Sequence, residues 1–266
     1  SYNIPEIYTN YVLKVDGDEK ILNSIINKFY IRWSKEKLFN SYNSRLFSLY
    51  FEQKNLDDVT KSDFMSKEYT YGYVKNLPYE SKINEDFIGY NSEMLDDFAK
   101  RTGVTFKVRE YNSIKDLTSA LNNGKVDIAF NYYDYKDLTN NFDYTVSPYK
   151  EKIVVLSSIK NVNTTVNSFR SLKGQEVYML ENKIANYITD KTDITVKAFK
   201  KASTLFNSLN DNSIVILDYN TYDYYRNNEL SGYKVIYEQD INTNFSFILL
   251  NSNKNRSFVS LYKYYI

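Results

Sequence analysis

Three segments between Asp86 and Leu156 decide how this chain folds. They read D-F-I-G-Y-N-S-E-M-L over residues 86–95, N-N-G-K-V-D-I-A-F over residues 122–130, and F-D-Y-T-V-S-P-Y-K-E-K-I-V-V-L over residues 142–156. The second segment turns at Gly124 and then enters a short apolar run, which is typical of a strand in a sheet covered on both faces. The third segment ends in another strand pattern at residues 152–156.

Strand and helix patterns alternate from about residue 69 to the end. Met94, Leu95, Phe98 and Ala99 share one helical face, and Gly103 suits the position after that helix. The expected strands are 69–74, 104–108, 126–130, 152–156, 176–180, 194–198, 214–217, 233–237 and 245–250. The expected helices are 92–100, 113–123 capped by Ser113, 183–189, 204–209 capped by Ser203, 219–227 and 257–266. This alternation predicts two α/β units.

The first 68 residues follow a different pattern. Residues 21–29 form a strong helical stripe (Ile21, Leu22, Ile25, Ile26 and Phe29), preceded by Asp16 and Asp18 as candidate caps. A second apolar stripe lies within residues 38–50, and residues 52–63 are polar enough for a linker.

Composition excludes several classes of function. The 266 residues contain 34 Lys and Arg against 33 Asp and Glu, so net charge gives no reason to expect nucleic acid. The absence of His and Cys removes His general bases, thiol nucleophiles and Cys/His zinc sites, and any metal would need oxygen ligands. We therefore predict neither a metal nor a cofactor.

No apolar run approaches the length of a membrane span, and no signal peptide is recognisable. If the protein is exported, its targeting or anchoring segments are expected to lie outside this chain.

Six short motifs, in one order over nearly 200 residues, carry a family resemblance. They are Pro78-Tyr79, the G-Y-N-S-E element at 89–93, the G-K-V-D turn at 124–127, S-P-Y at 147–149, L-K-G at 172–174, and Asp218 after the run 214–217. In this order they resemble the type 2 periplasmic-binding-protein, or Venus flytrap, family, in its amino-acid-binding branch. The resemblance implies an α/β fold of two lobes joined by two hinge strands.

The resemblance also implies domain boundaries. Residues 69–266 would form the solute-binding domain, with lobe 1 at about 69–150 plus 245–266 and lobe 2 at about 151–244. Residues 1–68 would be an N-terminal helical segment with a linker. Because residues 8–33 resemble the tail of such a domain, they suggest a chain cut from tandem flytraps. Alternatively, this helix completes the same domain in permuted fashion or is a simple amphipathic packing helix.

In open α/β sheets, ligands bind beyond the carboxyl ends of the strands. In this chain, the residues at the carboxyl ends of the expected strands are 76–79, 131–134, 180–183 and 218. The resemblance therefore implies a ligand-binding site in the cleft between the lobes, formed by Tyr79, Asn131, Tyr132, Tyr133, Asp134, Asn182, Lys183 and Asp218. An acid at the position of Asp218 pairs with the ligand ammonium in amino-acid-binding relatives; the alternative is a cap for helix 219–227.

The carboxylate clamp of the family is missing from its expected place. The position of the family's arginine falls at Thr139, and no arginine lies between Glu110 and Arg170. The helix start with Ser or Thr in the second lobe is replaced by Asn182-Lys183, where Lys183 would offer a point charge without a planar fork. We therefore expect a small-molecule solute that is not a conventionally clamped α-amino acid.

The tyrosines leave two interpretations open. Tyr79, Tyr90, Tyr132 and Tyr133 would stack on a planar, sugar-like or cationic ligand, or they would fill the interface between the lobes.

Three classes of function follow from the resemblance. The first is the extracytoplasmic sensor domain of a membrane-anchored signalling protein, which signals by lobe closure with or without a ligand. The second is the binding component of an amino-acid-type ABC transporter, which would partner a permease. The third is an enzyme using Glu93, Glu181 or Asp218, which we do not expect because nothing brings two of these acids together. The missing clamp and the tandem-like tail favour the sensor, at the cell surface or in the periplasm.

Overall fold

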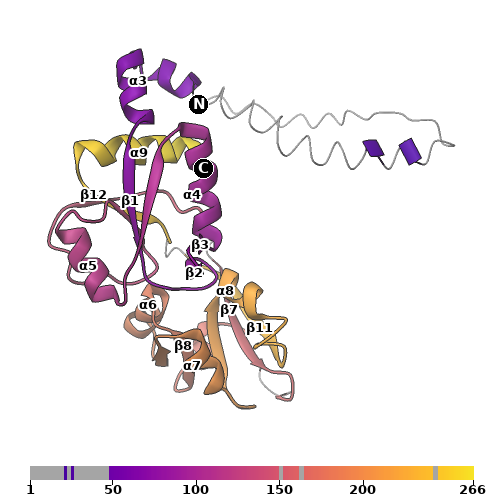
Figure 1. Cartoon of the computed structure of the whole chain (residues 1–266). Coiled ribbons are helices and arrows are strands. Elements are labelled where there is room, and N and C mark those ends of the chain that lie inside the picture. The colour runs from indigo at the N-terminus through magenta and orange to yellow at the C-terminus, as the bar shows by residue number, and fades with distance from the viewer. Residues whose placement is uncertain (1–20, 23–24, 27–47, 150–151, 162–164, 242–244) are drawn as a thin grey trace. The chain divides into compact units, whose positions relative to one another are not determined.

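The computed structural model describes residues 21–22, 25–26, 48–149, 152–161, 165–241 and 245–266 (Figure 1). The chain divides into two compact units, residues 1–53 and 54–266. In the first unit, residues 21–22, 25–26 and 48–53 are helical, in agreement with the predicted stripes where these residues are described. The remainder of the tail-like stretch 8–33, including its predicted caps, lies outside the described residues.

The second unit begins with a helix where we predicted a linker. Helix α3 (Asp58–Met65) follows Asp57, whose side chain accepts a hydrogen bond from the Thr60 amide at 2.7 Å. Phe64 is buried and anchors this helix. The polar composition was misleading because a good cap and one apolar anchor are sufficient for a short helix on a larger core.

Lobe 1 is built on a five-stranded sheet in the order β4-β1-β5-β12-β6. Its strands are β1 (Glu68–Tyr73), β4 (Thr105–Glu110), β5 (Ile128–Phe130), β6 (Phe142–Tyr144) and β12 (Phe247–Leu250). Strand β1 pairs parallel with β4 and β5, whereas β12 pairs antiparallel with β5 and β6. The helices of this lobe are α4 (Tyr90–Thr102), α5 (Ile114–Asn122) and α9 (Asn253–Tyr265), and a small hairpin joins β2 (Ser81–Ile83) to β3 (Asp86–Ile88).

Lobe 2 has a second five-stranded sheet in the order β11-β7-β10-β8-β9. Its strands are β7 (Lys152–Ser158), β8 (Glu176–Leu180), β9 (Thr195–Phe199), β10 (Ile214–Asp218) and β11 (Tyr233–Asp240). Strands β8, β9 and β10 run parallel, and β7 runs antiparallel to β10 and β11. Three helices, α6 (Lys183–Lys191), α7 (Ala202–Asn207) and α8 (Tyr219–Tyr225), lie with this sheet (Figure 1), together with the 3-10 helix η2 (Phe169–Leu172).

Two connections carry the chain between the sheets, one from β6 to β7 and one from β11 to β12. They contain residues 150–151 and 242–244, which are not described, so the predicted hinge strands lie partly outside the described residues.

The helix boundaries follow local signals in most places. Ser113 caps α5 by accepting from the Asp116 amide, as predicted, and Gly103 ends α4 with a φ of 78°. The predicted cap at Ser203 is wrong: α7 begins earlier, with Lys201 as its N-cap and without a side-chain cap. Strand β10 is buried at every position, whereas in β8 Glu176 is exposed and Tyr178 is half-buried.

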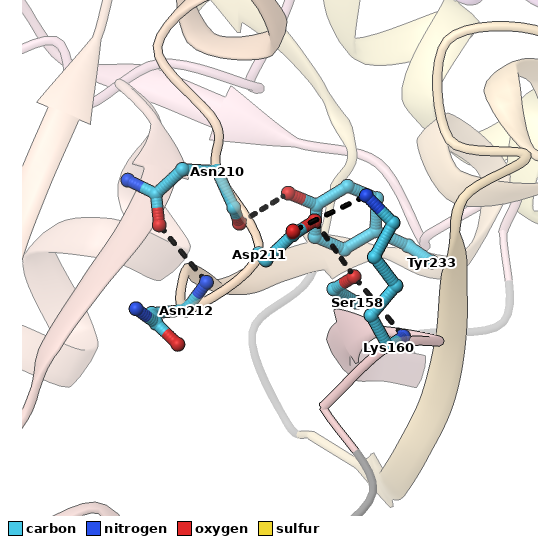
Figure 2. A network of polar contacts seen from close by, with 6 residues as sticks. All are labelled: Ser158, Lys160, Asn210, Asp211, Asn212 and Tyr233. Atoms are coloured by element: carbon cyan, nitrogen blue, oxygen red, sulfur yellow. Dashed lines mark hydrogen bonds and ion pairs between the residues drawn. The ribbon is translucent and has the colours of Figure 1, made fainter.

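Figure 2 shows the polar network at the end of lobe 2 where β10 begins. The Asp211 carboxylate accepts from Lys160 Nζ at 3.2 Å and from Ser158 Oγ at 3.4 Å, and the Tyr233 hydroxyl donates to the Asn210 carbonyl at 2.8 Å. These contacts fix the turn before β10 to the ends of β7 and β11. Because Asp218 lies at the opposite end of β10, the network supports the sheet and lies away from the predicted site.

Candidate functional site

Four strand ends bring predicted site residues into one buried cluster between the lobes. Tyr79 follows β1, Tyr132 follows β5, Asn182 follows β8, and Asp218 ends β10. Their exposed fractions are 0%, 1%, 5% and 4%. We call these four residues the cleft cluster. The strand-end rule therefore correctly places these side chains at one location, yet they are covered by the protein itself.

Both carboxyl oxygens of Asp218 are engaged inside the protein. Oδ1 accepts from the Tyr79 hydroxyl at 2.6 Å and from the Thr221 amide at 2.9 Å, while Oδ2 accepts from Thr221 Oγ1 at 2.8 Å. Asp218 is thus the N-cap of α8, which is the alternative that the sequence left open. Burial raises the pKa of Asp218, and the hydrogen bonds from Tyr79 and Thr221 act against that rise.

Tyr79 makes this contact from the other lobe. Its hydroxyl also accepts a hydrogen bond from Asn220 Nδ2 at 3.2 Å. Burial, followed by the neighbouring Asp218, raises the pKa of Tyr79 well above its ordinary value, so the phenol keeps its proton and acts as the donor. The place where a ligand ammonium would meet Asp218 in the family pattern is therefore taken by a phenol hydroxyl.

The start of α6 is occupied in a similar way. The Lys183 amide donates to the Tyr132 carbonyl across the lobe boundary at 3.1 Å. Asn182 caps the helix by accepting from the Ala185 amide at 3.0 Å. Free backbone amides at the start of a helix readily bind a carboxylate. Here the first amide of α6, that of Lys183, is already hydrogen-bonded to a carbonyl oxygen of lobe 1.

Aromatic rings fill the remaining space around Tyr79. Its ring centroid lies 5.0 Å from Phe130, 5.2 Å from Tyr149 and 5.5 Å from Tyr132. Phe245 lies 5.0 Å from Tyr132. Of the two interpretations for the tyrosines, this packing matches the filling of the lobe interface at Tyr79 and Tyr132. Tyr90 meets Tyr79 edge to face at 6.1 Å.

The other predicted site residues lie around this cluster. Asn131, with its amide oxygen facing lobe 2, accepts from Lys183 Nζ at 3.2 Å and donates to the Tyr133 carbonyl. The Lys183 ammonium also lies 5.7 Å from the centre of the Phe245 ring. Asp134 accepts from Asn186 Nδ2 at 3.1 Å. These contacts tie the lobes together, so Lys183 does not stand as an isolated charge in place of the missing arginine.

Thr139, the expected position of the family's arginine, is exposed and its amide donates to Asn122 Oδ1 at 3.0 Å. Among the described residues that line the cavities at this cleft, none is an arginine. Arg170 instead lines a separate cavity of 580 Å³ together with Phe169, Lys173 and Asp193. In the part of the chain that the structure describes, no guanidinium therefore replaces the clamp.

Sequence reasoning missed a buried carboxyl next to the cleft cluster. Glu80 is 2% exposed and accepts from the Tyr71 hydroxyl and from Asn91 Nδ2, the latter at 3.1 Å. Asn91 in turn accepts from the Tyr149 hydroxyl. Burial raises the pKa of Glu80 to about 8, although both hydrogen bonds act in the opposite direction. The only signal in the sequence is a glutamate directly after Pro78-Tyr79, and nothing local indicates its burial.

Gly89 positions the segment that carries Tyr79. Its φ is 113°, and a Cβ there would lie 2.7 Å from the Pro78 carbonyl oxygen and even closer to that of Tyr79. A glycine is therefore required where α4 begins against this turn.

In the described part of the chain, no three His, Cys, Asp or Glu side chains are grouped to hold a metal ion. Among the same residues, no helix has the length and apolarity to cross a membrane. Glu181 is exposed, whereas Asp218 is buried and fully hydrogen-bonded.

Two α/β lobes whose strand ends face each other across a small polar and aromatic cluster define a solute-binding protein of the Venus flytrap type. The chain belongs to the bacterial extracellular solute-binding proteins, family 3, whose family model matches residues 70–216. No curated protein matches the chain.

Solved structures share the fold at low sequence identity. An ancestral arginine-binding protein bound to arginine is 17% identical, with a TM-score of 0.56 over 75% of this chain and 90% of that one. A histidine kinase sensor domain similar to periplasmic binding proteins is 15% identical, with a TM-score of 0.57 over 74% and 88%. The periplasmic VFT2 domain of Bordetella pertussis BvgS is 16% identical, with a TM-score of 0.55 over 76% and 87%. The two-lobed fold predicted from the sequence is confirmed, and both transport and sensor proteins occur among its neighbours.

Proposed function

We propose that this chain is the extracytoplasmic sensor domain of a membrane-anchored signalling protein, and that closure of its two lobes is the signal. The observation that supports this function is the double occupation of the cleft by groups of lobe 1. The Tyr79 hydroxyl donates a hydrogen bond to Asp218, and the Tyr132 carbonyl accepts one from the first amide of α6. These are the two places where an α-amino acid would bring its ammonium and its carboxylate.

A solute entering this cleft must displace the protein's own contacts. A hydrogen bond to a charged or strongly polar buried group contributes roughly 1.5–3 kcal/mol, so displacing Tyr79 from Asp218 would weaken binding roughly 10- to 150-fold. A transport receptor needs a cleft that captures and releases cargo, and this cost opposes capture. A sensor can instead use closure without a ligand as one of its two signalling states.

The same contacts argue that the solute, if it enters the cleft, is not a conventionally clamped α-amino acid. A thermal-shift screen of the twenty amino acids tests this point. A ligand at one hundred times its dissociation constant adds about 2.7 kcal/mol of stability. We expect no amino acid at 10 mM to raise the melting temperature of the wild-type chain, and a strong rise with arginine or glutamine would contradict the proposal.

The alternative is the binding component of an amino-acid-type ABC transporter, which the transport proteins among the structural neighbours favour. Sequencing the gene beyond the codon for Ile266 would distinguish the sensor from the transport component. A membrane span followed by a kinase or cyclase domain is expected for the sensor. A permease, or a lipoprotein cysteine upstream of residue 1, would instead favour transport.

A further inference from the structure

Two adjoining cavities lie beside the cleft cluster. One of 540 Å³ and one of 320 Å³ share Lys75, Tyr133, Glu181, Lys200 and Lys201. We call these two cavities together the rim groove. Lys75 and Tyr133 belong to lobe 1, and the other three residues belong to lobe 2. A solute in this groove would touch both lobes without entering the aromatic cluster.

The charges along the rim groove favour an anion. Its lining contains four lysines, Lys75, Lys115, Lys200 and Lys201, against two glutamates, Glu110 and Glu181. Lys75 pairs with Glu110 at 3.3 Å, so the remaining lysines outnumber the remaining acid. Lysine ammoniums are compact point donors, which suit carboxylate and phosphate groups.

Two buried residues, Asn76 and Tyr132, form part of the wall of the 320 Å³ cavity. Asn76 Nδ2 makes no hydrogen bond with any described residue. Asn76 is 9% exposed and Tyr132 is 1% exposed, and both residues line this cavity. Asn182 and Thr221 approach the Tyr132 hydroxyl closely enough to lower its pKa, although burial raises that pKa far more. Both atoms are shielded from solvent and lie behind the cavity wall, so the lysines are the donors that a solute in the groove would meet.

We propose that the rim groove binds a small polyanion that carries carboxylate or phosphate groups. Lys75 and Lys115 would hold it from lobe 1, and Lys200 and Lys201 would hold it from lobe 2. Because both lobes contribute donors, the anion stabilises the closed arrangement over any open one. This inference deepens the proposed function, since it names the class of solute that the closed domain would sense.

Calorimetric titration of the purified chain with inorganic pyrophosphate and with citrate, at constant ionic strength, tests the inference. We expect saturable binding of at least one probe, which also separates phosphate from carboxylate recognition. In the double variant Lys200→Gln/Lys201→Gln, the dissociation constant should rise at least tenfold.

The matched control is Lys107→Gln/Lys263→Gln, which removes the same charge from exposed lysines outside the described cavities. Its dissociation constant should stay within twofold of the wild type. Equal weakening in both double variants would mean nonspecific charge attraction and would overturn the inference, as would the absence of saturable binding of both probes. Neither result would alter the response to free amino acids, which tests the proposed function separately.

Discussion

Glu80 gives the protein a pH-dependent stability that can be calculated from its surroundings. It is buried, and its two hydrogen-bond donors, the Tyr71 hydroxyl and the Asn91 amide, are neutral. The titratable groups that it influences from the elements around it are also neutral phenols, namely Tyr71, Tyr73, Tyr133, Tyr135 and Tyr149. No cation among the described residues offsets the desolvation, so the pKa of Glu80 rises from 4.5 to about 8.

The sign of the effect follows from proton binding. Between pH 4.5 and 8, the folded state holds a proton on Glu80 that the unfolded state has lost. Stability therefore falls as pH rises through this window, by up to about 1.4 kcal/mol per pH unit. Between pH 5.5 and 7.5, this one carboxyl should remove up to about 2.7 kcal/mol from the free energy of unfolding.

Urea unfolding followed by circular dichroism at pH 5.5, 6.5 and 7.5 measures this slope. Glu80→Gln keeps the size and polarity of the side chain but cannot ionise, so it should remove most of the slope and be the more stable protein at pH 7.5. Glu176→Gln, at an exposed position on β8, should leave the slope unchanged. The account of Glu80 is refuted if Glu80→Gln and the wild type lose stability at the same rate.

Two further substitutions test the segments that position the cleft cluster. Gly89→Ala should lower the free energy of unfolding by roughly 2–3 kcal/mol or more, because it combines a left-handed φ with a clash against the Pro78 carbonyl. The control is Gly174→Ala, where φ is 76° and the space around the Cβ is open. It should lower the free energy of unfolding by only about 1 kcal/mol in the same urea assay. Asn182→Ala removes the cap of α6 and should cost about 1 kcal/mol, and an unchanged urea midpoint would show that the cap contributes nothing.

The fold was predictable where periodic patterns and turn residues coincide. The alternation of β8, α6, β9 and β10 follows from apolar runs of strand length separated by amphipathic stretches, and the structure confirms it. The three-residue strands β2, β3 and β6 were missed because each is too short to show a measurable period, whereas β5 was predicted as part of a longer apolar run. The helix α3 was missed because its single buried phenylalanine makes no stripe.

The candidate site was predictable only in part. The strand-end rule correctly brings Tyr79 and Asp218 together, because it depends on topology. It does not predict that the phenol and the carboxyl bond to each other, since they are 139 residues apart in sequence and come from different lobes. The burial of Glu80 was equally hidden, because a charged residue in a loop is normally exposed.

The central claim is that the lobes close without a solute and that the Tyr79–Asp218 contact helps to hold them. The chain has no cysteine, so Lys107→Cys on β4 and Glu176→Cys on β8 would carry the only two spin labels, one on each lobe. Double electron–electron resonance on the ligand-free protein should give one narrow distance distribution, which broadens toward longer distances when Tyr79→Phe is added. A ligand-free protein that already samples long distances, and that Tyr79→Phe leaves unchanged, would contradict the claim.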